Sequence, residues 1–166
     1  MKEKISGLAE EFAKYAIKFE ETQQHGNFQD GNFYSAKIME NGDKMKSNYA
    51  LAVVLLDKLL TSNLPSVLLH SCLYALLVNY RTQEALILLE KIVREGNGLT
   101  GFTADITLEL YGIGELFELH GIRNWNSAGG NKIVIGANSH PIYKLKKAWG
   151  PHAFFWCIIY PNAKSV

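Results

Sequence analysis

The fold class follows from residues 48–96, which read NYALAVVLLDKLLTSNLPSVLLHSCLYALLVNYRTQEALILLEKIVREG. Apolar residues recur there at three- and four-residue spacing, which is the spacing of one buried face of an α-helix. Asn48 can cap a first helix, and Pro65 suits the first turn of a second. Thr82 can cap a third helix, which Gly96 closes. The second of these helices carries almost no charge, so we expect it to be central and buried.

Helical spacing continues on both sides of this stretch. It predicts an amphipathic helix over residues 3–25, a second over 30–46 and a last one that opens at Thr100 and ends near 112–114. The glycine at position 42 is expected to weaken the second helix near its end. Two sets of side chains are expected to face inward, namely Phe33, Tyr34, Ile38 and Met45 in the second helix, and Leu51, Val54, Leu55 and Leu59 in the helix after Asn48.

These helices predict a mainly α fold. Four consecutive amphipathic helices joined by short connectors favour antiparallel helical hairpins. The closest architecture is two irregular units of the HEAT type stacked on the N-terminal helices, with about six helices in all. We therefore expect a HEAT-like helical domain over residues 1–119.

Residues 120–166 have a different composition. They contain no Asp or Glu, six Lys and Arg, and all three tryptophans of the chain. Short apolar runs at 132–136 and 154–160 are candidate strands of a β-hairpin, and 142–149 is a candidate short helix. The alternative is a loosely packed extension that is not a shaped domain. We expect a basic, aromatic C-terminal extension packed on the helical domain.

The composition also limits the class of protein. A chain of 166 residues with 48% hydrophobic content suits one compact domain with an extension. Cys72 and Cys157 lie far apart in apolar stretches and imply no disulfide framework. The N-terminus has no hydrophobic signal core, and apolar runs such as 50–56 are too short to span a bilayer. We expect a soluble, cytoplasmic protein that does not enter a membrane.

Three segments between Leu76 and Leu116 carry a pattern known from other proteins. They are Asn79-Tyr80 before the helix EALILLEKI at 84–92, the run GLTGFTADITL at 98–108, and the closing Gly114-Glu115-Leu116. They resemble a small bacterial family that is catalogued as a domain of unknown function numbered twenty-nineteen. Its members share an "EAL..LE.I" helix, a "G..GF.A.MTL" helix start and a closing "GEL". Residues 12–46 resemble the first two helices of the family, so the resemblance covers residues 5–118.

The resemblance implies a short, all-helical, HEAT-like fold without an established activity or catalytic residues. Members of the family are often encoded beside secreted polymorphic toxins, which implies that some are immunity proteins. The sequence departs from the family pattern after Leu116, where many members end. The segment 120–166 therefore has no counterpart from which a role could be carried over.

His70 is the best single candidate for a catalytic residue. It shares a narrow polar stripe with Ser66 and Tyr74, which lie one helical turn away on either side. Serine and histidine at hydrogen-bond distance can act as nucleophile and base. However, no acidic residue lies at helical spacing to orient the imidazole, and the sequence has no Gly-x-Ser-x-Gly motif. We favour a buried polar stripe bonded to neighbouring backbone or water, and we expect no catalytic residue.

Metal and cofactor chemistry has no support in the sequence. The five histidines and two cysteines include no two at the spacing of metal ligands. The glycine-rich segments 96–98 and 129–132 do not match a phosphate-binding loop, and they are better interpreted as a helix stop and a turn. We therefore expect no metal, no cofactor and no enzyme activity.

The acidic charge of the helical domain favours a protein partner. Residues 48–119 hold eight acidic and four basic residues, a net charge of −4. Nuclease toxins are commonly basic because they hold phosphates, so an acidic immunity protein can steer to such a site and cover it. The alternative is an ordinary solvated helical surface. We expect a non-catalytic protein-binding module, and in its sharpest form an immunity protein that neutralises a basic secreted toxin domain by direct binding. Its predicted contact residues are Glu84, Asp105, Glu109, Glu115 and Glu118.

An alternative function uses the C-terminal extension, in which basic and aromatic residues are interleaved. This combination can hold single-stranded nucleic acid by phosphate contact and base stacking. The residues that would make these contacts are Arg123, Lys144, Lys146, Lys147 and Trp149. We prefer the interpretation that the aromatic residues form a small core against the acidic domain, with the lysines around its rim.

Overall fold

The computed structural model describes residues 2–96 and 98–122 of the chain. Within these ranges it contains seven helices and no strand, so the fold is mainly α, as the sequence predicts. The helices are α1 (Lys2–His25), α2 (Phe28–Ser47), α3 (Tyr49–Leu59), α4 (Pro65–Leu77), α5 (Thr82–Glu95), α6 (Leu99–Ile113) and α7 (Glu115–Leu119). The first six agree with the helices predicted from the sequence.

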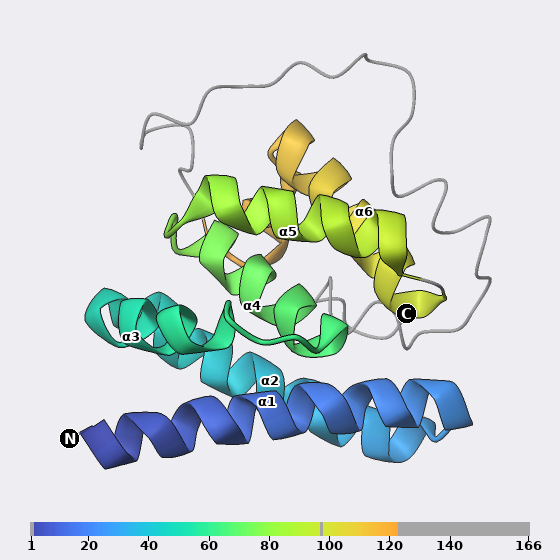
Figure 1. Ribbon diagram of the computed structural model, residues 1–166, viewed down its shortest axis with the longest axis horizontal. Coiled ribbons are helices and arrows are strands. Elements are labelled where there is room, and N and C mark those ends of the chain that lie inside the picture. The colour runs from blue at the N-terminus through green and yellow to red at the C-terminus, as the bar shows by residue number, and fades with distance from the viewer. Residues whose placement is uncertain (1, 97, 123–166) are drawn as a thin grey trace. The chain divides into compact units, whose positions relative to one another are not determined.

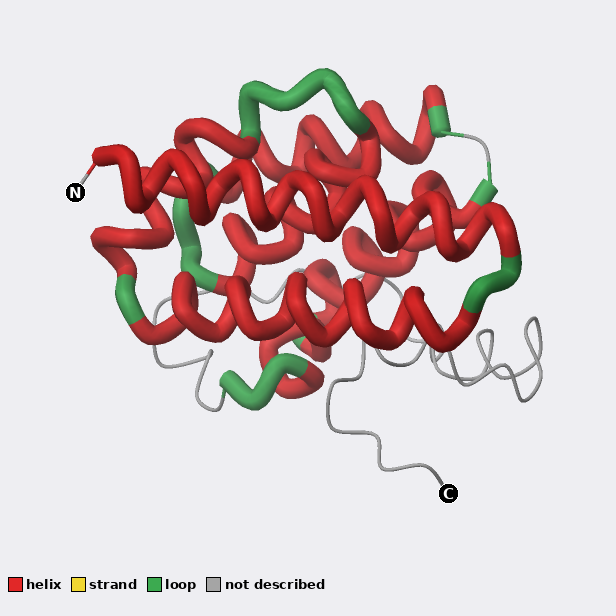
Figure 2. Tube along the Cα trace, turned by 90° about the horizontal axis from the view of Figure 1, so that it is seen from below, coloured by secondary structure: helices red, strands yellow, loops and turns green. Residues whose placement is uncertain are grey.

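The chain forms two compact units, residues 1–105 and 106–166, with the boundary inside α6. The first unit is built from helical hairpins. Figure 2 shows α1 and α2 side by side and running in opposite directions. In Figure 1, α4 lies between this hairpin and α5, and it packs against α1, α2, α3 and α5. The predicted strands and helix of the C-terminal extension lie outside the described residues.

Helix α4 is central to the first unit because its sequence offers no charged face. From Ser66 to Leu77 every residue except Leu68 is buried, which confirms the expectation from its composition. Full burial of one leucine or valine side chain contributes about 1.5–3 kcal/mol, so this helix supplies much of the core. Even so, none of the helices in the described ranges has both the length and the apolar character that crossing a bilayer requires.

Gly42 lets α2 approach α4 closely. A Cβ atom added at this position would overlap the ring of Tyr74, so only glycine leaves room for that ring. The ring of Phe12 from α1 meets Tyr74 edge-on, with ring centroids 6.0 Å apart. Gly42 is predicted to weaken the helix near its end, whereas α2 continues through it to Ser47. Close packing, rather than a helix end, accounts for this glycine.

Two predicted inward side chains are in fact exposed. Phe33 is 54% exposed and Val54 is 47% exposed. The buried face of α2 instead consists mainly of small and polar residues, and that of α3 is shifted by one position toward Leu56. These buried residues are Gly31, Ser35, Ile38, Asn41, Gly42 and Met45 in α2, and Ala52, Leu55, Leu56 and Leu59 in α3. The prediction was wrong at Phe33 because the face of α2 that closely approaches α4 is made of small residues such as Gly42. It was wrong at Val54 because the buried stripe of α3 is offset from the predicted one and includes Leu56 instead.

The predicted cap of α5 is also different. Arg81, not Thr82, occupies the N-cap position, and its backbone is in the left-handed region with φ 47°. The hydroxyl of Thr82 donates a hydrogen bond back to Oδ1 of Asn79 at 3.1 Å. The chain between α4 and α5 therefore reverses through Asn79 and Arg81. The side chain of Thr82 stabilises this turn and does not cap the first amides of α5.

The described part of the second unit consists of the end of α6 and the short helix α7. Gly114 separates them with a left-handed φ of 81°, which glycine adopts without strain. The rings of Tyr111 and Phe117 then lie 5.8 Å apart across this break. The sequence predicts the end of α6 near this glycine, but not the helical turn that follows it.

Candidate functional site

The polar stripe of α4 is where the sequence places it, but the protein encloses it. Ser66, His70 and Tyr74 are all buried, and His70 is only 2% exposed. Its imidazole lies edge-on against the ring of Phe19 from α1, with ring centroids 5.8 Å apart. Nδ1 of His70 is buried and has no hydrogen-bond partner within the described ranges. Burial lowers the pKa of His70 to about 4, so the ring is neutral at neutral pH.

This environment lacks the parts of a nucleophile–base pair. Burial alone lowers the pKa of His70, so no carboxylate stabilises an imidazolium there. The sequence predicts that this polar stripe bonds to neighbouring backbone or water, but Nδ1 of His70 has no such partner within the described ranges. The hydroxyl of Ser71, which lies outside the predicted stripe, donates to the carbonyl oxygen of Val67 at 2.6 Å. We therefore assign His70 to the hydrophobic core of the first unit.

Metal and thiol chemistry is not assembled in the described part of the chain. No group of three or more His, Cys, Asp and Glu side chains there could hold a metal ion. Cys72 is a buried free thiol, and burial, together with the charge of Glu84, raises its pKa to about 12. A thiol that stays protonated and enclosed is a poor nucleophile. Cys157 lies outside the described residues.

The five predicted partner-contact residues lie on helices of both units, and none of them is buried. In the first unit, Glu84 is in the first turn of α5 and Asp105 is exposed on α6. In the second unit, Glu109 is on α6, and Glu115 and Glu118 share the first turn of α7. Residues 106–122 contain no Lys or Arg, so the described part of this unit is acidic.

The residues predicted for nucleic-acid contact are not part of the described structure. They are Arg123, Lys144, Lys146, Lys147 and Trp149. The glycine-rich segment 129–132 also lies there. Gly96, by contrast, ends α5 as predicted, and its amide donates to the carbonyl oxygen of Ile92 at 2.6 Å.

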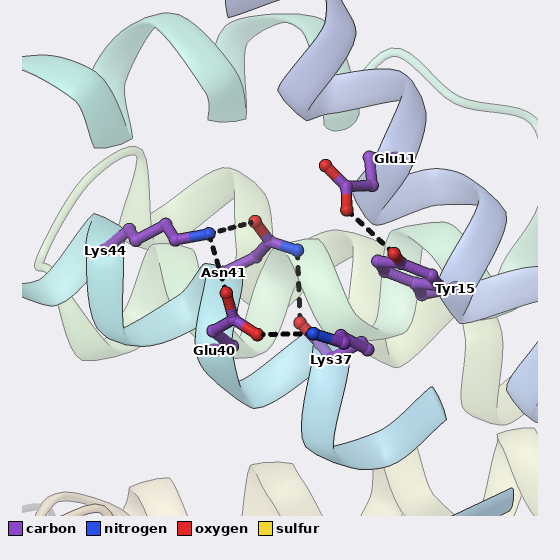
Figure 3. Close-up of polar contacts among 6 residues, drawn as sticks. All are labelled: Glu11, Tyr15, Lys37, Glu40, Asn41 and Lys44. Atoms are coloured by element: carbon purple, nitrogen blue, oxygen red, sulfur yellow. Dashed lines mark hydrogen bonds and ion pairs between the residues drawn. The ribbon is translucent and has the colours of Figure 1, made fainter. Parts of the chain in front are cut away.

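The outer face of the α1–α2 hairpin carries a local polar network (Figure 3). Glu40 binds Lys37 at 2.9 Å and Lys44 at 3.1 Å, and both partners lie within one turn of it on α2. The two lysines lower the pKa of the Glu40 carboxyl, since they stabilise its charged form. Exposed pairs of this kind are screened by solvent and contribute little to stability. Both cations come from the same helix, so the charge of Glu40 is neutralised within α2.

The turn between α4 and α5 is the most unusual backbone in the described ranges. Asn79 has φ 55° and Arg81 has φ 47°, and they are the only described residues other than glycine with positive φ. Asparagine tolerates this region, but a long side chain such as arginine is disfavoured there. Such residues persist where surrounding contacts hold them, and they cluster at functional sites.

Four side-chain contacts join this turn to α3 and α5. The hydroxyl of Tyr80 donates to Oδ1 of Asp57 on α3 at 2.6 Å, and Nη1 of Arg81 lies 3.2 Å from the same oxygen. Nε of Arg81 pairs with Glu84 in the first turn of α5. The ring of Tyr49, at the start of α3, meets the ring of Tyr80 edge-on at 6.4 Å. The turn thus joins α3 and α5 through side chains that remain at the surface.

We call the side chains around this turn the turn surface. It comprises Tyr49, Val54 and Asp57 of α3, Tyr80 and Arg81 of the turn, and Glu84 and Ile87 of α5. Of these residues, only Glu84 is predicted from the sequence as a partner contact. The one sequence feature that points to the unusual turn is the connection between α4 and α5, Val78 to Arg81, which contains neither glycine nor proline. A reversal without those residues requires left-handed backbone at other residue types.

No protein-family model matches the chain, and neither the curated proteins nor the solved structures provide a match.

Proposed function

We propose that the protein is a non-catalytic protein-binding module and, specifically, an immunity protein that neutralises a cognate bacterial toxin by direct binding. The observation that carries this proposal is the acidic surplus on a helical scaffold. Residues 48–119 have a net charge of −4, and none of the five predicted contact carboxylates is buried. A toxin that holds nucleic-acid phosphates must present basic groups, which an acidic surface attracts and covers.

The enclosure of His70 supports the non-catalytic part of the proposal. The ring is 2% exposed and lies against Phe19, so a solvent-borne substrate does not reach it in this conformation. The resemblance of residues 5–118 to the family numbered twenty-nineteen supports the immunity role, because members of that family are often encoded beside secreted toxins.

Co-expression tests the proposal directly. The probe is a toxin domain read from the open reading frame adjacent to the gene for this chain, produced in a sensitive host with and without the full-length protein. An adjacent reading frame that encodes no toxin domain would count against the proposal. We expect the protein to restore growth and to co-purify with the toxin domain as a complex that weakens at high salt. Failure of both rescue and co-purification would overturn the proposal. Affinity for single-stranded DNA that falls steeply with salt and is lost on removal of residues 120–166 would favour the nucleic-acid function instead.

A further inference from the structure

The turn surface exposes large apolar side chains around two carboxylates. Tyr49 is 57% exposed and Ile87 is 53% exposed, and Val54 is also exposed. Helical residues three positions apart are neighbours, so Val54 lies beside Asp57 and Ile87 lies beside Glu84. Apolar side chains that lie next to a polar centre and remain in solvent are characteristic of protein interaction sites.

The side chains at the polar centre of this surface contact one another within the free chain. Asp57 binds Tyr80 and Arg81, and Glu84 binds Arg81 as well. The backbone of the turn is left-handed at Asn79 and at Arg81. Binding normally carries an entropic cost for each flexible side chain that becomes ordered. Side chains that are already ordered avoid most of this cost. Tyrosine and arginine are also among the residues that most often dominate binding energy.

The charge of the turn surface indicates the chemistry of its partner. Two carboxylates share the single guanidinium of Arg81, which leaves one negative charge. Lys58, the next residue after Asp57, is directed to Ser6 and Glu10 of α1. Asp57 already accepts two hydrogen bonds, and a carboxylate can accept about four, so it retains acceptor capacity. The α2 network differs, since Glu40 is neutralised by two lysines.

We propose that the turn surface is where this chain binds its protein partner. The partner contributes a lysine or arginine to Asp57 and Glu84 and an apolar side chain against Tyr49. This assignment rests on the proposed function, because a basic toxin domain supplies such cations. It extends that function by locating the contact on α3, the α4–α5 turn and the start of α5. Of the five contact residues predicted from the sequence, only Glu84 belongs to this surface.

Matched substitutions test the assignment on the full-length protein. The probe is the toxin domain encoded beside the gene, and its Kd is measured by titration calorimetry. We expect Tyr49→Ala and Glu84→Lys each to raise the Kd by about 30-fold, the effect of a binding hot spot. The controls are Phe33→Ala, a similarly exposed aromatic on α2, and Glu40→Lys, a more exposed glutamate paired within its own helix. They should change the Kd by less than about threefold.

The salt dependence separates the two contributions at the turn surface. High salt should diminish the loss caused by Glu84→Lys, because it screens the charge contact, and should leave the loss caused by Tyr49→Ala unchanged. If the wild type binds and the two turn-surface variants bind as tightly as their controls, the assignment is wrong while the proposed function stands. If the wild type forms no complex, the proposed function itself fails, and the assignment fails with it.

Hydrogen exchange provides a test that needs no substitution. In the wild-type complex, amides at 78–84 should exchange more slowly than in the free protein, while those at 37–44 in the α2 network should be unaffected. Far-UV circular dichroism of each variant shows whether it is folded. If a variant is not folded, hydrogen exchange in the wild-type complex decides whether the turn surface is the contact. Protection at 37–44 without protection at 78–84 would overturn the assignment.

Discussion

Acidification is expected to destabilise the protein through His70. The folded protein encloses the neutral ring and lowers its pKa to about 4, whereas the reference value is 6.5. Above pH 6.5 the ring is neutral in both the folded and unfolded chains, so the full stability is present. As the pH falls from 6.5 toward 4, the unfolded chain binds a proton that the folded chain does not. The free energy of unfolding therefore decreases across this window.

The magnitude follows from the two pKa values. Their difference, at about 1.4 kcal/mol for each pKa unit, corresponds to about 3 kcal/mol of stability lost by pH 4. The ring is 2% exposed, so solvent screens little of this effect. For a domain of this size a loss of about 3 kcal/mol is a large fraction of the total stability, which is about 5–15 kcal/mol.

Urea unfolding of the wild type and of His70→Leu, followed by circular dichroism across this pH range, measures the effect. Leucine occupies a similar volume without a titratable group, so its stability at neutral pH should differ by less than about 1.5 kcal/mol. Acid should cost His70→Leu about 3 kcal/mol less than it costs the wild type. Titrating carboxylates affect both proteins equally and cancel in the difference. Equal pH dependence in the two proteins would refute the burial argument.

Two other measurements test the packing of α4. Gly42→Ala should cost about 1–3 kcal/mol in urea unfolding because its Cβ would overlap Tyr74, whereas Gly7→Ala, with open space around its Cβ, should gain up to about 1 kcal/mol. Equal stability of these variants would contradict the close approach of α2 and α4. In a Cys157→Ser background, Cys72 should react with a thiol reagent only as fast as the protein opens, since its thiol is buried and its pKa is about 12. Rapid labelling of the folded protein would show that the thiol is accessible.

The helices were predictable because their information is local. The spacing of apolar residues and the positions of Pro65 and Gly96 indicate helix extents without knowledge of neighbouring helices. Which apolar residues face inward was harder to predict. Phe33 is large and apolar yet exposed, because the face of α2 that meets its neighbours is made of small residues such as Gly42. Packing distance, which the sequence does not state, determines that face.

The candidate sites show the same division. The sequence places His70, Ser66 and Tyr74 on one stripe of a helix that carries almost no charge. Only the structure shows that Phe19 of α1 encloses this stripe and leaves the imidazole neutral. The turn surface could hardly be predicted from the sequence, because Asp57 and Arg81 are far apart along the chain and meet only in the folded protein.

The sequence by itself determined the mainly α class, the extents of the first six helices, the central position of α4 and the acidic balance of residues 48–119. These properties depend on residue spacing and composition, which act over one helical turn or require only counting. Tertiary structure decided that Gly42 seats Tyr74, that His70 is enclosed, and that Asp57 and Glu84 hold Tyr80 and Arg81 at the surface. These properties depend on which helices meet and how closely, and that is settled only when the helices pack.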